Sequence, residues 1–363
     1  MNRKYVMITV TEKCNLQCRY CYEEHKSGKV IKKELAILLI EEELNKDDEY
    51  DLVEIDFHGG EPFLYFDMIR EICEFVWKRK YKKRYYFFAT TNGTLMSDEV
   101  KEWLTKNKDR FICCLSIDGN RKMQNINRDN SFDSIDYNFF QKTWSFQDIK
   151  MTISQETLPC LAEGVIFLHQ CGFKISENFA YGIDWKEEQN LINLSKELSK
   201  LIDYYVKYPD IKRCRLLSVP IEYLSYTFED NINCSIGGTL AVYDTDGVKY
   251  PCHFFQPNAI GREKSKKSRE INFSDKSIYK DPECVGCGAL NICPTCYGAN
   301  YAATGNVALR DKSMCGMTKL SAKATGYLYY CLIERYGIKK LGFSPEKEKA
   351  VLLGIQKANL LEV

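Results

Sequence analysis

The stretch that decides the fold is the loop Cys14-Asn15-Leu16-Gln17-Cys18-Arg19-Tyr20-Cys21, which directly follows the apolar run Val6-Met7-Ile8-Thr9-Val10. A 4Fe–4S cluster takes one thiolate per iron, so a loop with three cysteines leaves one iron open to a small molecule. Two alternatives fit less well. A zinc site usually needs a fourth ligand nearby, such as His25, and CxxxCxxC is not the usual zinc spacing. Free core thiols do not suit a loop that Asn15, Gln17 and Arg19 make polar.

This loop, with aromatic Tyr20 before its last cysteine, resembles the signature of the radical S-adenosylmethionine (SAM) superfamily. The resemblance implies that Cys14, Cys18 and Cys21 hold a 4Fe–4S cluster whose open iron binds the amino and carboxylate groups of SAM. One electron then cleaves SAM to methionine and a 5'-deoxyadenosyl radical, which abstracts a hydrogen atom from a substrate. Tyr20 is expected to pack near the adenine end of SAM.

Short apolar runs alternate with helix-period segments from residue 3 to about residue 208. The pattern predicts strands over 5–10, 52–57, 85–90, 111–117, 150–154 and 174–180, and helices near 32–44, 66–82, 97–107, 134–143 and 158–170. Such βα units predict a parallel sheet with crossover helices. They are too few for a closed eight-stranded barrel. The predicted fold class is therefore α/β, similar to the partial (β/α)6 TIM-like barrel of radical SAM enzymes.

Polar motifs follow the first four predicted strands. They are the cysteine loop, His58-Gly59-Gly60-Glu61-Pro62, Thr91-Asn92-Gly93 and Ser116-Ile117-Asp118-Gly119. In parallel β/α folds the chemistry gathers at the carboxyl ends of the strands. We therefore expect these motifs to face one site.

The family resemblance assigns several of these residues to SAM. Glycines without a Cβ let the backbone approach a ligand, and the family's motif at Gly59, Gly60 and Glu61 binds the SAM amino group. Asn92, Ser116 and Asp118 resemble further strand-end contacts to SAM, and Arg128 resembles the arginine whose fork geometry suits the SAM carboxylate. The alternatives are an ordinary βα turn at Gly59-Gly60 and an Asp118 that caps its own turn.

A second group of cysteines lies near the carboxyl end, at Cys234, Cys252, Cys284, Cys287, Cys293, Cys296 and Cys315. Their order resembles the SPASM domain, which carries two auxiliary 4Fe–4S clusters, although Cys293 and Cys296 are separated by two residues and not three. The resemblance puts Cys234, Cys252 and Cys296 on the first auxiliary cluster, and Cys284, Cys287, Cys293 and Cys315 on the second. Cys214 or a substrate thiolate would complete the first, and a zinc ribbon remains the alternative for the CxxC pair.

Three parts are expected along the chain. The radical SAM barrel covers residues 1–210 and ends with a helix over 187–208, the SPASM domain covers 211–316, and a helical tail with breaks at Gly337 and Pro345 covers 317–363. Within the second part, segments 239–243 and 248–252 alternate about Asp244-Thr245-Asp246-Gly247, which predicts a β-hairpin.

Composition narrows the cellular setting. Seventeen cysteines without a secretory signal or an apolar run of membrane length indicate a reducing cytoplasm. Lys and Arg (51) balance Asp and Glu (50), so no overall field points to nucleic acid or to a membrane surface. Some cysteines are expected to be buried thiols, namely Cys73, Cys113, Cys114, Cys171 and Cys331.

The resemblance implies a peptide maturase that installs a thioether or carbon–carbon crosslink in a ribosomal peptide, with ferredoxin or flavodoxin as reductant. An alternative is an anaerobic sulfatase-maturating enzyme, but its proposed general base is an Asp directly after the second SPASM cysteine. Here that residue is His253, which could accept a proton near neutral pH or simply pack. A non-catalytic iron–sulfur electron-transfer module leaves Gly59 to Glu61 unexplained. With thirteen residues before the cluster loop, a leader peptide would bind the barrel or SPASM surface, or a separate leader-recognition protein, unless the substrate has no leader.

Overall fold

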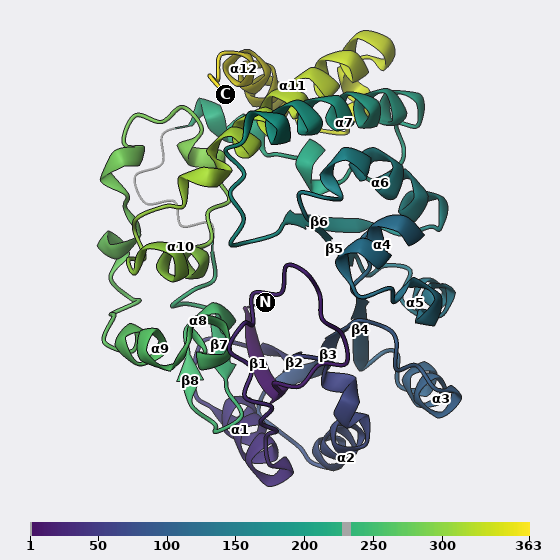
Figure 1. The fold of residues 1–363 in the computed structure, drawn as a ribbon, viewed down its shortest axis with the longest axis vertical. Helices are drawn as coiled ribbons and strands as arrows, with labels where there is room; N and C mark the ends of the chain where they lie inside the picture. Colours follow the sequence, from purple (N-terminus) through teal and green to yellow (C-terminus); the bar gives the residue numbers. More distant parts are fainter. Residues whose placement is uncertain (1, 227–233) are drawn as a thin grey trace. The chain divides into compact units, whose positions relative to one another are not determined.

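The computed structural model describes residues 2–226 and 234–363 (Figure 1). Contacts divide the chain into two compact units. Unit 1 comprises Met1–Ile117, Arg128–Ile149 and Ser235–Asp275, and unit 2 comprises Asp118–Asn127, Lys150–Cys234 and Lys276–Val363. These units interleave along the sequence, whereas the three parts expected from composition are consecutive and remain a prediction.

Unit 1 is built on one sheet with strand order β4-β3-β2-β1-β7-β8. Its strands are β1 Arg3–Thr11, β2 Leu52–Gly59, β3 Arg84–Thr91, β4 Phe111–Leu115, β7 Leu240–Tyr243 and β8 Lys249–Tyr250. Strands β1 to β4 are mutually parallel and lie side by side in Figure 1. Ile55, Phe87 and Phe111 occupy paired positions across them and are completely buried, as expected for strands of a parallel sheet. The predicted α/β class is confirmed.

The helices of unit 1 are α1 Lys33–Asn45, α2 Phe66–Trp77, α3 Asp98–Lys106, α5 Tyr137–Thr143, α8 Pro257–Ile260 and α9 Arg262–Ser268. The first four were predicted, and the short α8 and α9 were not. The Ser97 and Asp136 side chains accept N–H groups in the first turns of α3 and α5, as helix N-caps do. Helix α2 ends at Trp77, although the prediction placed its end at residue 82. Six of the seven residues over 78–84 are basic, and like charges three or four positions apart destabilise a helix.

The predicted hairpin is confirmed as the antiparallel pair β7 and β8, with Gly247 in the turn at φ +79°. Only the structure shows where this hairpin goes. Strand β7 pairs in parallel with β1, with Met7 opposite Val242, and so extends the main sheet beyond its first strand. The segment between Cys234 and Cys252 therefore shares a sheet with the strand that leads into the cysteine loop.

Unit 2 contains the two-stranded sheet of β5 Ile149–Ile153 and β6 Ile175–Phe179. Its helices are α4 Arg121–Asn127, α6 Leu161–Gln170, α7 Glu188–Lys207, α10 Tyr297–Thr304, α11 Cys315–Tyr336 and α12 Pro345–Asn359. Helix α11 contacts both α7 and α12 (Figure 1). The predicted breaks are confirmed, because Gly337 ends α11 at φ +80° and Pro345 begins α12. Helices α4 and α10 were not predicted.

The cysteines expected to be core thiols divide in two. Cys73, Cys113 and Cys114 are buried, whereas Cys171 and Cys331 are partly exposed, so that expectation was wrong for these two. Among the described residues, no helix combines the length and the apolar character required to cross a bilayer.

Candidate functional site

The cysteine loop leaves the end of β1 as a compact turn in unit 1. The Cys21 N–H donates to the Cys18 carbonyl at 3.1 Å, and the Leu16 N–H points to Cys14 Sγ at 3.5 Å. All three thiols are partly exposed, and Lys26 Nζ lies 3.3 Å from Cys21 Sγ. The loop thus presents three accessible sulfurs from one short turn, and sulfur is the donor that an iron–sulfur cluster requires.

Gly59 and Gly60 are required by the protein chain itself. A Cβ on Gly59, where φ is +129°, would lie 2.0 Å from the Thr11 carbonyl oxygen, and one on Gly60 would lie 2.2 Å from the Lys13 oxygen. The same backbones are hydrogen-bonded, from Gly60 to Thr11 at 2.9 Å and from Glu61 to Lys13 at 2.8 Å. The predicted contact of these glycines with SAM remains a prediction, and the structure shows a second reason for a glycine at each position. The two glycines let the end of β2 pack against the start of the cysteine loop.

Glu61 is buried and its carboxylate accepts three protein hydrogen bonds. The donors are Thr91 Oγ1 at 2.8 Å, the Asn92 N–H at 2.7 Å and the Phe63 N–H at 3.1 Å. Burial raises the pKa of Glu61 to about 7, although the hydrogen bonds and the positive charge of Arg128 act to lower it. Glu61 thus connects the end of β2 to the end of β3.

Asn92 connects the turn after β3 to the cysteine loop. Its Nδ2 donates to Asn15 Oδ1 at 2.9 Å, and Asn15 Nδ2 donates to Thr94 Oγ1 at 2.8 Å. Thr94 Oγ1 in turn donates to Asn92 Oδ1 at 2.7 Å. Asn15, which lies between the first two cysteines, is an anchor of the loop that the sequence-based prediction did not include.

Arg128 and Tyr20 lie together in unit 1. The Arg128 guanidinium is 5.5 Å from the centre of the Tyr20 ring and close enough to Glu61 to affect its pKa. Ser116 is buried and its N–H donates to the Thr91 carbonyl at 2.9 Å. Tyr20, Glu61, Asn92 and Arg128 thus gather around the cysteine loop, and a cationic guanidinium next to an aromatic ring suits SAM's carboxylate and adenine.

Asp118 belongs to unit 2, and both oxygens of its carboxylate accept hydrogen bonds from the protein. Its Oδ1 accepts the Thr152 N–H at 2.8 Å and its Oδ2 accepts Asn127 Nδ2 at 3.1 Å, while its own N–H donates to Gln124 Oε1 at 2.8 Å. These bonds tie the start of α4 to β5. They favour the alternative in which Asp118 has a structural role, and its predicted contact with SAM remains a prediction.

His253 belongs to an aromatic cluster in unit 1. The sequence analysis singled out His253 but did not predict that it lies beside Tyr22, His58 and Phe254. Its ring lies 5.4 Å from those of both Tyr22 and His58, and Tyr22 stacks on Phe254 at 4.6 Å. Tyr22 Oη and His58 Nε2 are hydrogen-bonded at 3.2 Å. Burial, and to a lesser degree His253, lower the pKa of His58 to about 3, so its imidazole is neutral. The sequence did contain a signal for this cluster, because Tyr22 directly follows Cys21 and His58 directly precedes Gly59, and both neighbours belong to predicted motifs.

Unit 2 contains a cavity of about 370 Å³ lined by five cysteines. They are Cys284, Cys287, Cys293, Cys296 and Cys315. Electrostatic interactions link Cys315 to Cys284 and Cys287, and Cys293 to Cys284 and Cys315. The predicted ligands of the second auxiliary cluster therefore converge on one cavity.

The donor set of this cavity fits an iron–sulfur cluster. Among the described residues, no three His, Cys, Asp or Glu side chains are close enough to hold a single metal ion. The thiolates of a 4Fe–4S cluster bind different irons, so they stand further apart than the ligands of one ion. In addition, the Arg310 Nε in the wall is buried and has no hydrogen-bond acceptor within the described ranges. These residues would hold a thiolate-bound, negatively charged group.

The cysteines predicted for the first auxiliary cluster are distributed over both units. Cys252 is buried in unit 1, whereas Cys234 is exposed and Cys296 partly exposed in unit 2. Cys214, the candidate fourth ligand, is buried, and its thiol interacts with the Tyr205 hydroxyl and the Glu177 carboxylate. Arg215 and Leu216 line the cavity, but Cys214 does not.

Comparison with known proteins agrees with this geometry. Residues 8–135, which include the last part of β1, the cysteine loop and β2 to β4, match the family model of the radical SAM superfamily. This stretch of the chain therefore matches a radical SAM domain, and that family implies SAM and a 4Fe–4S cluster. An uncharacterized protein of Methanocaldococcus jannaschii is 28% identical over 213 residues, which are 57% of this chain and 72% of that protein. A probable GTP 3',8-cyclase of the same organism is 27% identical over 40% of this chain and 42% of its own length.

Solved structures share the fold over most of the chain. The anaerobic sulfatase-maturating enzyme anSMEcpe, with bound AdoMet and the Cp18Cys peptide, gives a TM-score of 0.69 at 20% identity, covering 94% of this chain and 100% of that one. SuiB of Streptococcus suis, bound to its precursor peptide SuiA, gives 0.56 at 18% identity, covering 86% and 76%. Identities this low show a common fold, that of radical SAM/SPASM enzymes.

Proposed function

We propose that this protein is a radical SAM/SPASM enzyme that modifies a peptide, and that it carries two auxiliary 4Fe–4S clusters besides the one at Cys14, Cys18 and Cys21. The observation that carries the proposal is the cavity of unit 2, where five cysteines converge. A radical SAM domain needs only its own cysteine loop to activate SAM, so a second cysteine site indicates further electron transfer or substrate binding. The proteins of known structure that share this fold were solved with bound peptides.

The residues of unit 1 have separate tasks in this proposal. Bound at the cysteine loop, a 4Fe–4S cluster and SAM supply a hydrogen-abstracting radical, with an external one-electron donor such as ferredoxin or flavodoxin. Arg128 would neutralise the SAM carboxylate, and the Tyr20 ring next to it would pack near the adenine. Gly59, Gly60, Glu61 and Asn92 hold the loop rigid through the contacts described above, and rigidity of this kind keeps reacting atoms aligned. Ser116 remains a predicted contact with SAM.

The substrate is proposed to be a ribosomal peptide in which a thioether or carbon–carbon crosslink is installed. Its leader would bind the barrel or SPASM surface, or a separate recognition protein. The proposed barrel covers residues 1–210, the proposed SPASM domain covers 211–316, and the proposed helical tail covers 317–363.

Sulfatase maturation is the second candidate, because the fold is more similar to anSMEcpe than to SuiB, with TM-scores of 0.69 and 0.56. Against it, His253 stands at the position of the proposed aspartate base and packs against Tyr22, His58 and Phe254. Incubation with a CxPxR peptide separates the candidates, since formylglycine would be detected by mass and would replace the crosslink proposal.

The test uses the full chain, reconstituted anaerobically with iron, sulfide and reductant. SAM is added together with deuterium-labelled versions of the small peptides whose genes lie beside the gene for this protein. The 5'-deoxyadenosine that forms is analysed by mass spectrometry. We expect peptide-dependent 5'-deoxyadenosine that contains deuterium, and none with the Cys14→Ala/Cys18→Ala/Cys21→Ala variant. Turnover that the peptide stimulates without any transfer of deuterium would contradict the proposal.

A further inference from the structure

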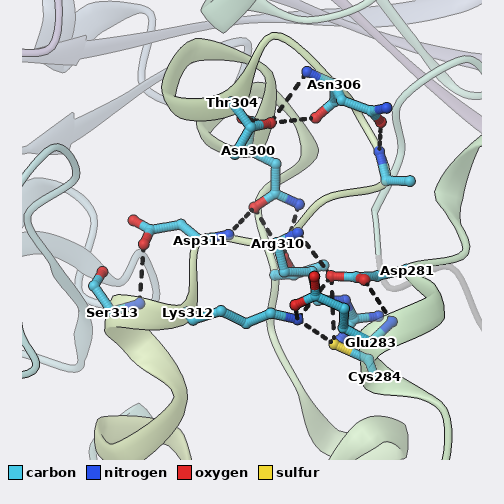
Figure 2. Close-up of polar contacts among 12 residues, drawn as sticks. Asp281, Glu283, Cys284, Asn300, Thr304, Asn306, Arg310, Asp311, Lys312 and Ser313 are labelled. Atoms are coloured by element: carbon cyan, nitrogen blue, oxygen red, sulfur yellow. Dashed lines mark hydrogen bonds and ion pairs between the residues drawn. The ribbon is translucent and has the colours of Figure 1, made fainter.

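A charged cluster in unit 2 adjoins the cysteine-lined cavity and has no part in the function proposed so far (Figure 2). At its centre, Lys312 Nζ lies 3.2 Å from Cys284 Sγ and 2.9 Å from Asp281 Oδ2. The Asp281 side chain is completely buried, and that of Lys312 is 32% exposed. The ammonium therefore lies between a buried carboxylate and one of the predicted cluster ligands.

Three protein donors hold the buried Asp281 carboxylate. Its oxygens accept the backbone N–H groups of Arg310 and Glu283, each at 2.9 Å. Lys312 Nζ, at 2.9 Å, is the third donor. The Asp281 carboxylate thus keeps the Lys312 ammonium in place at the sulfur.

The segment that carries Lys312 is itself held by helix α10. Asn300 Oδ1 accepts the Asp311 N–H at 3.1 Å, and Asn300 Nδ2 donates to the Val307 carbonyl at 3.4 Å. Asp311 Oδ1 accepts the Ser313 N–H at 2.9 Å and so caps the short 3-10 turn Lys312–Met314 (Figure 2). Lys312 therefore projects from a braced backbone, unlike a lysine on an open surface.

Arg310 is a second cation on the same segment. It lines the cavity, and its guanidinium interacts electrostatically with Cys293 and Cys284. Its Nε is buried without an acceptor in the part of the chain that the structure describes. Lys312 and Arg310 thus approach Cys284 and Cys293, and Lys312 interacts electrostatically with Cys315 as well, as does Lys319 in the cavity wall.

A 4Fe–4S cluster with four thiolate ligands is anionic and gains a further negative charge on reduction. Hydrogen bonds to its sulfurs and nearby cations stabilise the reduced form more than the oxidised form, and so raise the reduction potential. Asp281 Oδ2 lies 3.5 Å from Cys284 Sγ, so without Lys312 an uncompensated carboxylate would stand next to the thiolate. We propose that Lys312, positioned by Asp281 and supported by Arg310, raises the reduction potential of the cluster held by Cys284, Cys287, Cys293 and Cys315. This inference rests on the auxiliary cluster of the proposed function.

The test is a potentiometric titration of the reconstituted full chain, followed by EPR of the signal that Cys284→Ala abolishes. At the wild-type midpoint, we expect Lys312→Met to lower the ratio of reduced to oxidised cluster about tenfold, a shift of about 59 mV for one electron. Lys312→Arg, which keeps a charged N–H donor, should have a reduction potential close to that of the wild type. Lys340→Met is the matched control, because Lys340 also pairs with an aspartate of unit 2, Asp210 at 2.6 Å, but forms no hydrogen bond to a cysteine sulfur among the described residues.

Two further measurements make the outcomes distinguishable. Pulsed EPR of protein labelled with 15N-lysine should show a nitrogen coupling to the reduced cluster that Lys312→Arg removes, even if Lys312→Met loses iron. A wild-type midpoint in Lys312→Met at full iron content, or absence of the lysine coupling, would overturn the inference alone. Wild-type protein that binds iron for one cluster only would overturn the auxiliary clusters as well.

Discussion

The Asn92 N–H lies 2.7 Å from a carboxylate oxygen of Glu61, and this bond joins the ends of two neighbouring strands. Glu61 follows β2 and Asn92 follows β3, while the Asn92 side chain reaches Asn15 in the cysteine loop at 2.9 Å. A buried carboxylate therefore braces the loop that carries the predicted cluster ligands. The site depends on Glu61 for its shape, whether or not Glu61 also contacts SAM.

Glu61 should make stability depend on pH. Its native pKa of about 7 lies above the ordinary value of 4.5, so the native carboxyl binds more protons than the unfolded one between these values. The free energy of unfolding should therefore fall as pH rises from about 4.5 through 7, by on the order of 3 kcal/mol. Urea unfolding across this range should show a flatter profile for Glu61→Gln than for wild type. Glu102→Gln, on an exposed side chain of α3, should retain the wild-type slope, and equal slopes for all three proteins would contradict the prediction.

Gly60→Ala should displace the cysteine loop. The added Cβ would lie 2.2 Å from the Lys13 oxygen and 2.5 Å from its carbonyl carbon, and backbone atoms cannot move aside as a flexible side chain can. We expect the reconstituted variant to bind about four irons fewer per chain than wild type, the content of one cluster. Gly238→Ala is the control, because its nearest neighbour would be 3.8 Å away. Full iron content in Gly60→Ala would show that the loop adapts.

Asp118→Asn should destabilise the protein without weakening SAM binding. An amide offers one acceptor oxygen where the carboxylate serves Thr152 and Asn127 with two, and an unsatisfied buried group costs about 1–3 kcal/mol. Chemical denaturation measures the first effect and titration with SAM the second. A SAM affinity reduced at least about tenfold, which is 1.4 kcal/mol of binding energy, would instead support the predicted contact with SAM.

Cys214→Ala should leave the iron content unchanged. The Cys214 thiol faces Tyr205 and Glu177, and the residue is absent from the lining of the cavity. Iron and sulfide analysis of Cys214→Ala and Cys293→Ala provides the comparison, because we expect only the second variant to lose a cluster. Loss of iron from Cys214→Ala would assign it to the first auxiliary cluster.

Local patterns in the sequence carried much of the fold. The strands β1 to β6 are short apolar runs, and helices α1, α2, α3, α5 and α6 show helical periodicity, so these elements were recognisable near their observed positions, whereas the short helix α4 was not. Because β1 to β4 are parallel, the motifs that follow them had to lie at one edge of the sheet. The cysteine loop, Glu61 and Asn92 were therefore predicted as neighbours, and they are.

The sequence by itself thus determined the α/β class, the positions of the strands β1 to β4 along the chain and the cysteine pattern that resembles a radical SAM domain. Tertiary structure alone decided that Gly59 and Gly60 pack against Thr11 and Lys13, that β7 joins β1, and that Lys312 reaches Cys284. The physical reason is the separation of the contacting residues along the chain. Strands and cysteine loops arise from residues close together in the chain, whereas these contacts join residues from 28 to more than 200 positions apart, and no local pattern records which distant partner will fill a given space.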